Sequence, residues 1–230
     1  MKKLIVFFIS LCLFLVGCNN ASPVPAETTV PVVTEASEDT VATESTEAPR
    51  IIMPLPDTTM ENLTDAILSV SLEEGGAYVD GTGKMQMDLK IYTYDKYDMV
   101  DIANLKVGDI LFGHTSDVTV TSIERNDAGT IFINGGLDAG GFDLVTDEDG
   151  VFYEMGYSDH KSWYEVGKAT IRVSADFEFT DSSDLDVGEV VYYPGSFLVG
   201  EVTNYDFTPY NTTIRVENGQ IVELNRVYIP

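Results

Sequence analysis

Residues 213–229 read TIRVENGQIVELNRVYI, and this stretch indicates the fold class of the chain. Apolar and polar residues alternate on both sides of Asn218-Gly219, which is typical of two half-buried strands. Asparagine and glycine tolerate the two positive φ angles of a type I′ turn, which joins closely paired antiparallel strands. The stretch therefore predicts a β-hairpin with strands at 212–217 and 220–229.

The same alternation extends toward the N-terminus as far as about residue 66. AILSVSL (66–72) and KMQMDLKIYTY (84–94) alternate with period two and flank the glycine-rich EEGGAYVDGTG. Further strands are predicted at 109–113, 117–125, 130–134, 141–146, 151–157, 162–166, 168–175, 188–193 and 197–203. About a dozen short strands with little helix predict an all-β fold, either a barrel or a sandwich. A short helix over 60–68 is the alternative for that segment.

A sixteen-residue pattern occurs twice, 80 residues apart. YDMVDIANLKVGDILF (97–112) aligns with FEFTDSSDLDVGEVVY (177–192) without a gap, and 11 of the 16 positions hold identical or similar residues. Internal duplication explains such a match better than chance does, and two copies are too few for a solenoid. We therefore expect two pseudo-symmetric halves within one domain.

Each copy of the repeat is interpreted as a corner that leads into a strand. A strand ends at an aromatic residue, an aspartate starts a tight turn, a leucine closes one end of the core, and a glycine turns the chain. These positions are Tyr97, Asp101, Leu105 and Gly108 in the first copy and Phe177, Asp181, Leu185 and Gly188 in the second. Leu-x-Val-Gly followed by an acidic residue resembles the corners of small β-barrels, including the double-psi type.

The first residues have the organisation of an export signal. Two lysines precede an apolar run at 4–16, which as a helix would rise about 20 Å, short of a hydrocarbon core about 30 Å thick. The run ends in LVGC (15–18), which resembles the lipobox of bacterial lipoproteins. The resemblance implies a signal peptide at 1–17, lipidation of Cys18, membrane lipid as a partner, and a location on the outer side of the cell membrane. A secretory leader with a chance cysteine is the alternative.

Residues 18–56 are predicted to be a disordered tether, with an acidic all-β domain at 57–230. The tether is rich in Pro, Thr and Glu and has no helical or strand periodicity. Both cysteines, Cys12 and Cys18, precede the domain, so a disulfide, a thiol nucleophile and a thiolate metal site are not expected in it. The domain holds 32 acidic and 10 basic residues, a formal charge of −22, which excludes nucleic acid as a partner.

The domain offers few groups for catalysis, and we predict no catalytic, cofactor or metal residues in it. His114 and His160 are interpreted as turn or surface residues. The consecutive run Ser158-Asp159-His160 does not have the separated order of a catalytic triad. Carboxylates are plentiful, so a pair suited to glycan hydrolysis is an open alternative.

Three loops or clusters have both a structural and a functional interpretation. NDAG (126–129) and DEDG (147–150) are expected to be hairpin loops, and DEDG is also a possible source of calcium ligands. INGGLDAGGFDL (133–144) is either a bulged hairpin or a close approach for a ligand. Several aromatic residues either pack across strands or stack on sugar rings; they are Tyr92, Tyr94, Tyr97, Tyr153, Tyr157, Trp163 and Tyr164.

The sequence thus favours a lipid-anchored extracellular β domain without enzymatic activity. Its expected role is to bind an envelope or glycan ligand, or to be structural. A carboxylate-based glycan hydrolase and a calcium-stabilised adhesion module are the two alternatives.

Overall fold

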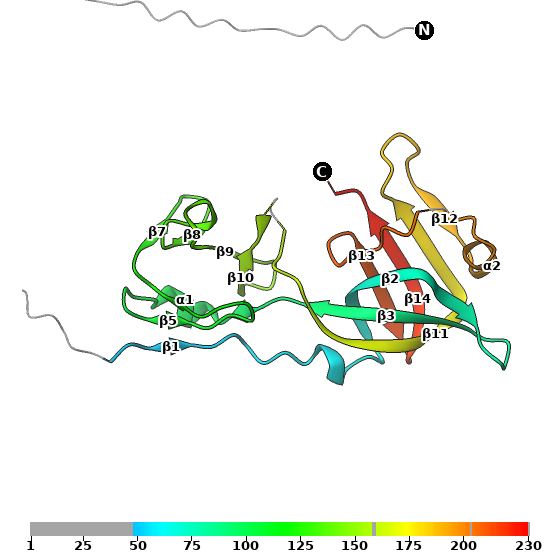
Figure 1. The fold of residues 1–230 in the computed structure, drawn as a ribbon, viewed down its shortest axis with the longest axis horizontal. Coiled ribbons are helices and arrows are strands. Elements are labelled where there is room, and N and C mark those ends of the chain that lie inside the picture. The colour runs from blue at the N-terminus through cyan, green and yellow to red at the C-terminus, as the bar shows by residue number, and fades with distance from the viewer. Residues whose placement is uncertain (1–47, 158–159, 203, 230) are drawn as a thin grey trace, which may run out of the picture. The chain divides into compact units, whose positions relative to one another are not determined.

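The computed structural model describes residues 48–157, 160–202 and 204–229. Within these residues the chain forms 14 β-strands and two short α-helices (Figure 1). No described helix has the length and apolar character needed to cross a membrane. The all-β prediction is confirmed.

The first lobe contains two small sheets. One has the order β1-β5-β6, with β1 (Ile51–Ile52) parallel to β5 (Ile110–Leu111) and β6 (Val118–Thr119) antiparallel to β5. The other is antiparallel, with the order β4-β10-β9-β8-β7. Its strands are β4 (Lys96–Tyr97), β7 (Ile123–Arg125), β8 (Ile131–Ile133), β9 (Phe142–Thr146) and β10 (Phe152–Met155). The helix α1 (Met99–Ala103) and the 3₁₀ turn η2 (Leu137–Ala139) complete this sandwich-like lobe.

The second lobe contains one six-stranded sheet, with the order β12-β11-β14-β13-β2-β3. The 19-residue strand β11 pairs with β3 along its first half and with β14 along its second, so five strands close into a ring. The strands are β2 (Ala66–Val79), β3 (Met85–Thr93), β11 (Tyr164–Ser182), β12 (Val190–Tyr192), β13 (Thr212–Glu217) and β14 (Gln220–Val227). The 3₁₀ turn η1 (Thr59–Glu61) precedes β2, and the helix α2 (Pro194–Leu198) follows β12.

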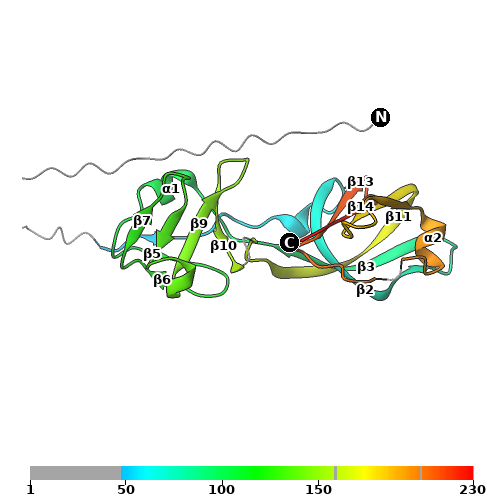
Figure 2. The same ribbon diagram turned by 90° about the horizontal axis from the view of Figure 1, so that it is seen from above.

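Each lobe has its own hydrophobic core. Tyr97, Ile102, Ile133 and Leu144 are buried at the centre of the first. The second is built from alternate residues of its strands and from packed phenylalanine rings; Phe179 lies 5.5 Å from Phe197 and 5.6 Å from Phe207 between ring centroids. In the two views of Figures 1 and 2 the strands of the lobes form separate groups, joined by short segments of chain.

The hairpin that indicated the fold class is present. Asn218 has φ 50° and Gly219 has φ 72°, the two positive angles of the predicted turn. β13 pairs antiparallel with β14 from Thr212↔Arg226 to Glu217↔Gln220. NDAG and DEDG also form hairpin loops, closed by backbone bonds from Gly129 N to Asn126 O (3.1 Å) and from Gly150 N to Asp147 O (3.1 Å).

Several predicted boundaries are wrong. The predicted strand at 197–203 begins within α2, where Pro194 occupies the first turn of the helix. The segments 162–166 and 168–175 belong to a single strand, β11, which has a register shift beside Gly167. The helical alternative for 60–68 is limited to the single turn η1, because β2 begins at Ala66.

The folded part also begins before Asp57, the predicted start of the domain. β1 pairs with β5, and Ile52 is buried in the first core. The backbone N–H of Arg50 donates to Asp109, and the N–H of Leu55 donates to the carbonyl of Lys96. Residues 50–55, which were assigned to the tether, therefore form part of the first lobe.

The two copies of the repeat have different local structures. In the first copy α1 follows Tyr97, with Asp98 rather than Asp101 as its N-cap. In the second copy the strand does not end at Phe177, because β11 continues to Ser182. Leu105 is buried, but Leu185 is 71% exposed, so its predicted role as a plug is wrong. Gly108 (φ 96°) and Gly188 (φ 81°) both have the predicted corner conformation. The lobes that hold the copies differ in strand order.

Candidate functional site

Two cavities in the described part of the chain differ in the kind of side chain that lines them. A cavity of about 540 Å³ along β2, β3 and β11 is lined by polar groups that already bind one another. Lys90 pairs with Glu73 at 2.7 Å, and the Thr170 hydroxyl donates to Asp88 at 2.5 Å. The second cavity is lined by an aromatic cluster, and it is the better candidate for a ligand site.

This second cavity, here named the junction cleft, has a volume of about 480 Å³. That volume lies within the usual range for small-molecule sites, about 300–1,000 Å³. The segment from Leu55 to Thr59 with Asn62 forms one wall, and the first residues of β2 form another. The remaining lining residues are Tyr92, Thr93, Tyr94, Lys96, Lys161, Trp163 and Tyr164.

Strand pairing explains why these aromatic residues meet. The end of β3 lies antiparallel to the start of β11, with Thr93 opposite Tyr164 and Tyr92 opposite Glu165. Trp163 immediately precedes β11, and Tyr94 immediately follows β3. The rings of Tyr94 and Trp163 pack edge to face with centroids 4.9 Å apart. The sequence analysis left open whether these rings pack across strands or stack on sugars. Tyr94 and Trp163 pack on each other, and both also line the cleft.

The ammonium of Lys161 lies among three aromatic rings. Its Nζ is 4.2 Å from the ring centroid of Tyr94, 5.1 Å from that of Tyr153 and 5.8 Å from that of Trp163. These distances are in the range of cation–π attraction. The same Nζ donates a hydrogen bond to Tyr94 Oη at 2.9 Å. An ammonium has three donors, and within the described residues only one hydrogen bond of the Lys161 ammonium is formed, to Tyr94.

A second ammonium approaches the same tyrosine. Lys96 Nζ is 5.0 Å from the ring centroid of Tyr94. Burial raises the pKa of the Tyr94 hydroxyl, and the positive charge of Lys96 opposes that rise. In the described part of the chain, neither Lys96 nor Lys161 forms an ion pair with a carboxylate. Two partly buried cations therefore converge on one ring in a strongly acidic protein.

Asp57 is the only carboxylate among the described residues that line the junction cleft. Its Oδ1 accepts hydrogen bonds from the Thr59 backbone N–H (3.1 Å) and the Thr59 hydroxyl (2.6 Å). This is a local turn motif that shapes the wall of the cleft. The lining therefore lacks the pair of carboxylates that glycoside hydrolysis requires.

Two other carboxylates lie next to the cleft without lining it. Asp95 accepts hydrogen bonds from the Tyr164 hydroxyl (3.0 Å) and from the backbone N–H of His114. Burial raises the pKa of Glu154 to about 7, the Ser162 hydroxyl opposes the rise, and the charge of Asp95 adds to it. Burial also raises the pKa of the Tyr164 hydroxyl, and Asp95 raises it further. Asp95 thus holds the hydroxyl of Tyr164, and Glu154 accepts a hydrogen bond from the Ser162 hydroxyl at 3.3 Å.

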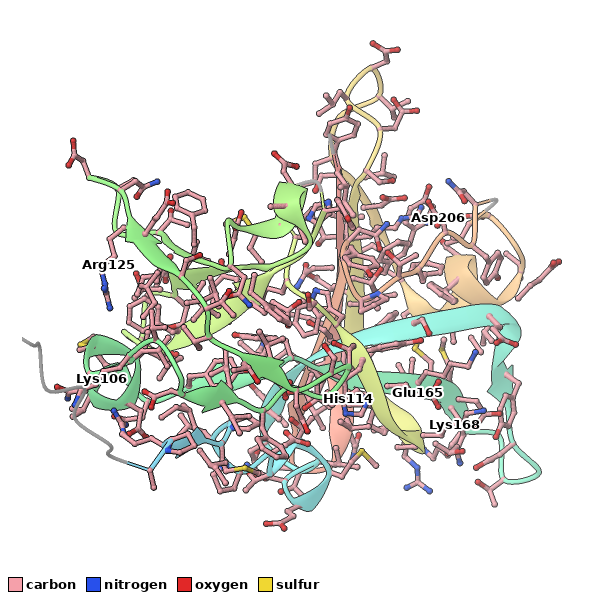
Figure 3. The ribbon with its side chains drawn as sticks, turned by 60° about the vertical axis from the view of Figure 1, so that its left-hand side comes forward. Lys106, His114, Arg125, Glu165, Lys168 and Asp206 are labelled. Atoms are coloured by element: carbon pink, nitrogen blue, oxygen red, sulfur yellow. The ribbon has the colours of Figure 1, made fainter. Side chains whose placement is uncertain are left out.

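Both histidines lie against tyrosine rings. His114, labelled in Figure 3, is exposed, and its ring stacks on Tyr164 with centroids 3.7 Å apart and an interplanar angle of 4°. His160 lies 5.5 Å from the ring of Tyr210. Ser158 and Asp159 lie outside the described residues, as does the predicted lipidation site, Cys18.

The two loops with a possible functional interpretation are explained by local structure. Asp147 Oδ1 accepts from the backbone N–H groups of Asp149 (3.0 Å) and Val151 (3.1 Å) inside its own turn. Among the described residues, no group of three or more His, Cys, Asp or Glu side chains could hold a metal ion. The glycine-rich segment connects β8 to β9, and an added Cβ at Gly141 would lie 1.9 Å from the Ile133 carbonyl oxygen. The segment is therefore the loop of a β8–β9 hairpin, with Gly141 packed against the backbone of that hairpin.

Comparisons with known proteins give no relative from which a function can be transferred. The chain matches no known family model, no curated protein and no solved structure. Its candidate function therefore rests on the chemistry of the junction cleft.

The sequence interpretation missed the two lysines of this cleft. Lys96 follows the run of tyrosines in YTYDKY, and Lys161 precedes the aromatic pair in KSWY. In both segments a lysine lies close to aromatic residues, and this pattern could have indicated a shared site. The pattern becomes informative only when the pairing of β3 with β11 is known, because that pairing brings the two segments together.

Proposed function

We propose that this protein is a lipid-anchored extracellular lipoprotein whose β domain binds a saccharide of the cell envelope in the junction cleft. The observation that carries the proposal is the gathering of Tyr92, Tyr94, Trp163 and Tyr164 around one cavity. Binding without catalysis is favoured over hydrolysis, because Asp95 and Glu154 do not line the cavity and Asp57 is engaged in its own turn.

The chemistry of the cleft suits a sugar ring. Aromatic faces attract the weakly polar C–H groups of a pyranose, and hydroxyl and amide groups bind its oxygens. The polar side chains of Thr58 and Ser69 also line the cleft.

Trp163 makes this proposal directly testable, because it is the single tryptophan of the chain. Residues 47–230 form a compact unit with both cores, and this unit is suitable for ligand titration. A panel of envelope oligosaccharides should contain a ligand that changes the fluorescence of Trp163. Binding heat measured by calorimetry should give the same Kd.

Substitution of Trp163 by Ala should weaken binding about 30-fold or more, since central aromatic anchors contribute about 2 kcal/mol or more to an interface. Tyr228→Ala is the matched control, because Tyr228 is 47% exposed and lines a different cavity. If every saccharide leaves the fluorescence and the heat unchanged, the saccharide proposal is wrong.

The membrane anchor is a separate part of the proposal and has its own test. Two or more acyl chains on Cys18 would hold the protein on the membrane, because each buried CH₂ adds about 0.8 kcal/mol. The wild-type protein should partition into the detergent phase, and Cys18→Ala should remain in the aqueous phase. Cys12→Ala is the matched control and should partition as the wild type does. Detergent partition of Cys18→Ala would contradict the lipoprotein assignment.

A further inference from the structure

The charge of the junction cleft is opposite in sign to that of the domain around it. Residues 57–230 carry a formal charge of −22 and only 10 basic residues, yet two of these, Lys96 and Lys161, line one cavity. The remaining titratable lining groups are Asp57 and three tyrosines. Asp147 and Asp149 act electrostatically on Tyr94 from the β9–β10 turn without lining the cleft.

The two ammonium groups are held where a bound sugar would meet them. Lys161 Nζ is fixed by its hydrogen bond to Tyr94 Oη (2.9 Å) and by the rings of Tyr94 and Trp163. Lys96 Nζ approaches the same ring at 5.0 Å. Tyr94 is thus approached by two cations, and its ring packs edge to face with that of Trp163. A ligand that stacks on these aromatic rings would place an acidic substituent beside two ammonium groups that form no ion pair with a described carboxylate.

We propose that the junction cleft selects a saccharide that carries a single anionic substituent on the sugar ring, a carboxylate or a phosphate monoester. This inference rests on the proposed saccharide-binding function and names its ligand class. A charge-assisted hydrogen bond from an ammonium to such a group is about twice as strong as a neutral one. A densely charged polyanion is a poor ligand, because the field of the acidic domain repels it beyond the short reach of two lysines.

Matched pairs of sugars separate this inference from the function on which it rests. The probes are cellobiose and cellobiouronic acid, N-acetylglucosamine and N-acetylmuramic acid, and glucose and glucose 6-phosphate. In at least one pair the acidic member should bind residues 47–230 about ten-fold more tightly than the neutral member. Preference in the first two pairs identifies a carboxylate ligand, and preference in the third identifies a phosphate.

The variants test whether the two lysines cause the preference. Lys96→Gln and Lys161→Gln should each lower the affinity for the acidic sugar several-fold, and the double variant should abolish the preference for the acidic over the neutral sugar. Lys161→Arg keeps the charge and should keep the preference. Lys168→Gln is the matched control, because Lys168 projects from β11 and lines the other cavity (Figure 3). Circular dichroism and Tm establish that each variant is folded.

The outcomes are distinct. Equal affinities for the acidic and neutral members of all pairs, or a preference that survives in the double variant, would overturn this inference and leave the saccharide proposal intact. Binding of no member of any pair would overturn this inference, and it would overturn the saccharide proposal as well if the panel of envelope oligosaccharides also gave no response. Loss of the acidic preference when NaCl rises from 50 to 500 mM, with unchanged binding of the neutral sugar, would support the role of the lysines.

Discussion

The two lobes carry the same sixteen-residue pattern at 97–112 and 177–192 and use its aspartate differently. In the first lobe Asp101 pairs with Arg50 at 2.8 Å, and the side chains of Asp101 and Arg50 are 49% and 36% exposed. In the second lobe Asp181 forms a two-pronged pair with Arg226, and these side chains are 14% and 3% exposed. The comparison teaches that burial, rather than the residue pattern, decides what the pair contributes to stability.

Burial of Arg226 is reinforced by its other contacts. Its guanidinium lies 4.6 Å from the ring centroid of Phe207 and 5.6 Å from that of Phe179, and its Nη1 donates to the carbonyl of Asn204 at 2.6 Å. A buried charge of this kind depends on its partner, because removal of the partner leaves an uncompensated charge. Arg50 meets water, which can replace Asp101.

The largest expected effect is therefore that of Asp181→Ala. It should lower the free energy of unfolding by about 3–5 kcal/mol, because Arg226 would remain buried without its partner. The matched change Asp101→Ala should cost about 0–1 kcal/mol. Urea unfolding monitored by circular dichroism measures both. Equal costs would refute the contrast between the two pairs.

The leucines of the two copies should also respond unequally. Leu105 is 6% exposed in the first core, so Leu105→Ala should cost about 2–4 kcal/mol through lost contacts and the cavity that remains. Leu185 is 71% exposed, so Leu185→Ala should change stability by about 0.5 kcal/mol or less. The same urea experiment serves here. A large loss for Leu185→Ala would indicate a partner surface or a different packing of the second copy.

The corner glycines of the two repeat copies, Gly108 and Gly188, should respond equally to substitution, in contrast to the aspartates and the leucines. Gly108 and Gly188 both have positive φ, and an added Cβ at either position would meet no heavy atom within 4 Å. Each Gly→Ala change should therefore cost about 1–2 kcal/mol from backbone conformation alone. A difference of more than about 1 kcal/mol between the two Tm-derived values would count against the shared corner geometry.

Buried carboxylates in the two lobes should give opposite pH dependences. Burial raises the pKa of Glu154 to about 7, above its value of about 4.3 in the unfolded chain, so stability from neutral Glu154 is complete below pH 4.3 and declines up to pH 7. Burial of Asp181 works in the same direction, but hydrogen bonds from Arg226 and Ser183 hold its pKa below the ordinary value. Its contribution is present above about pH 3.9 and declines below that pH.

Glu154→Gln isolates the first of these effects. Between pH 4.3 and 7 the wild type should lose about 1 kcal/mol of stability after allowance for solvent screening, and the variant should lose less. Asp95→Asn should lower the pKa of Glu154 and shift the decline to lower pH. Tm measured in steps from pH 4 to pH 8 follows the change. An identical pH profile for Glu154→Gln and the wild type would contradict the assignment.

The parts of the fold that were predictable from the sequence are those set by local chemistry. Asn218-Gly219 predicted the turn because both residues tolerate a positive φ angle. The alternation of apolar and polar residues predicted the strands β3 and β13. β1 was missed because its two residues pair in parallel with residues 110–111, and no local pattern encodes a contact across 59 positions. The last two residues of α2, Phe197 and Leu198, were included in the strand predicted at 197–203 because both are apolar.

The candidate site was predictable only as a list of aromatic residues. Tyr92, Tyr94, Trp163 and Tyr164 were all singled out, because tyrosine and tryptophan near strand ends have both structural and ligand-binding uses. Lys161 escaped notice because its contact with Tyr94 spans 67 positions and depends on the pairing of β11 with β3. For Leu185 the sequence pattern predicted too much. Leu185 aligns with the buried Leu105 and was expected to be buried, but it lies at the surface.

The position of β1 has a mechanical consequence. Tension applied to the chain before Arg50 reaches the fold first at β1, which is held to β5 by the backbone bonds Ile110 N to Arg50 O (2.8 Å) and Phe112 N to Ile52 O (2.9 Å). The wall of the junction cleft begins at Leu55, only three residues after β1 ends. A pull on the chain before Arg50, with a ligand held in the junction cleft, would therefore be carried through this short segment, and the two backbone bonds of the parallel pair would bear the load first.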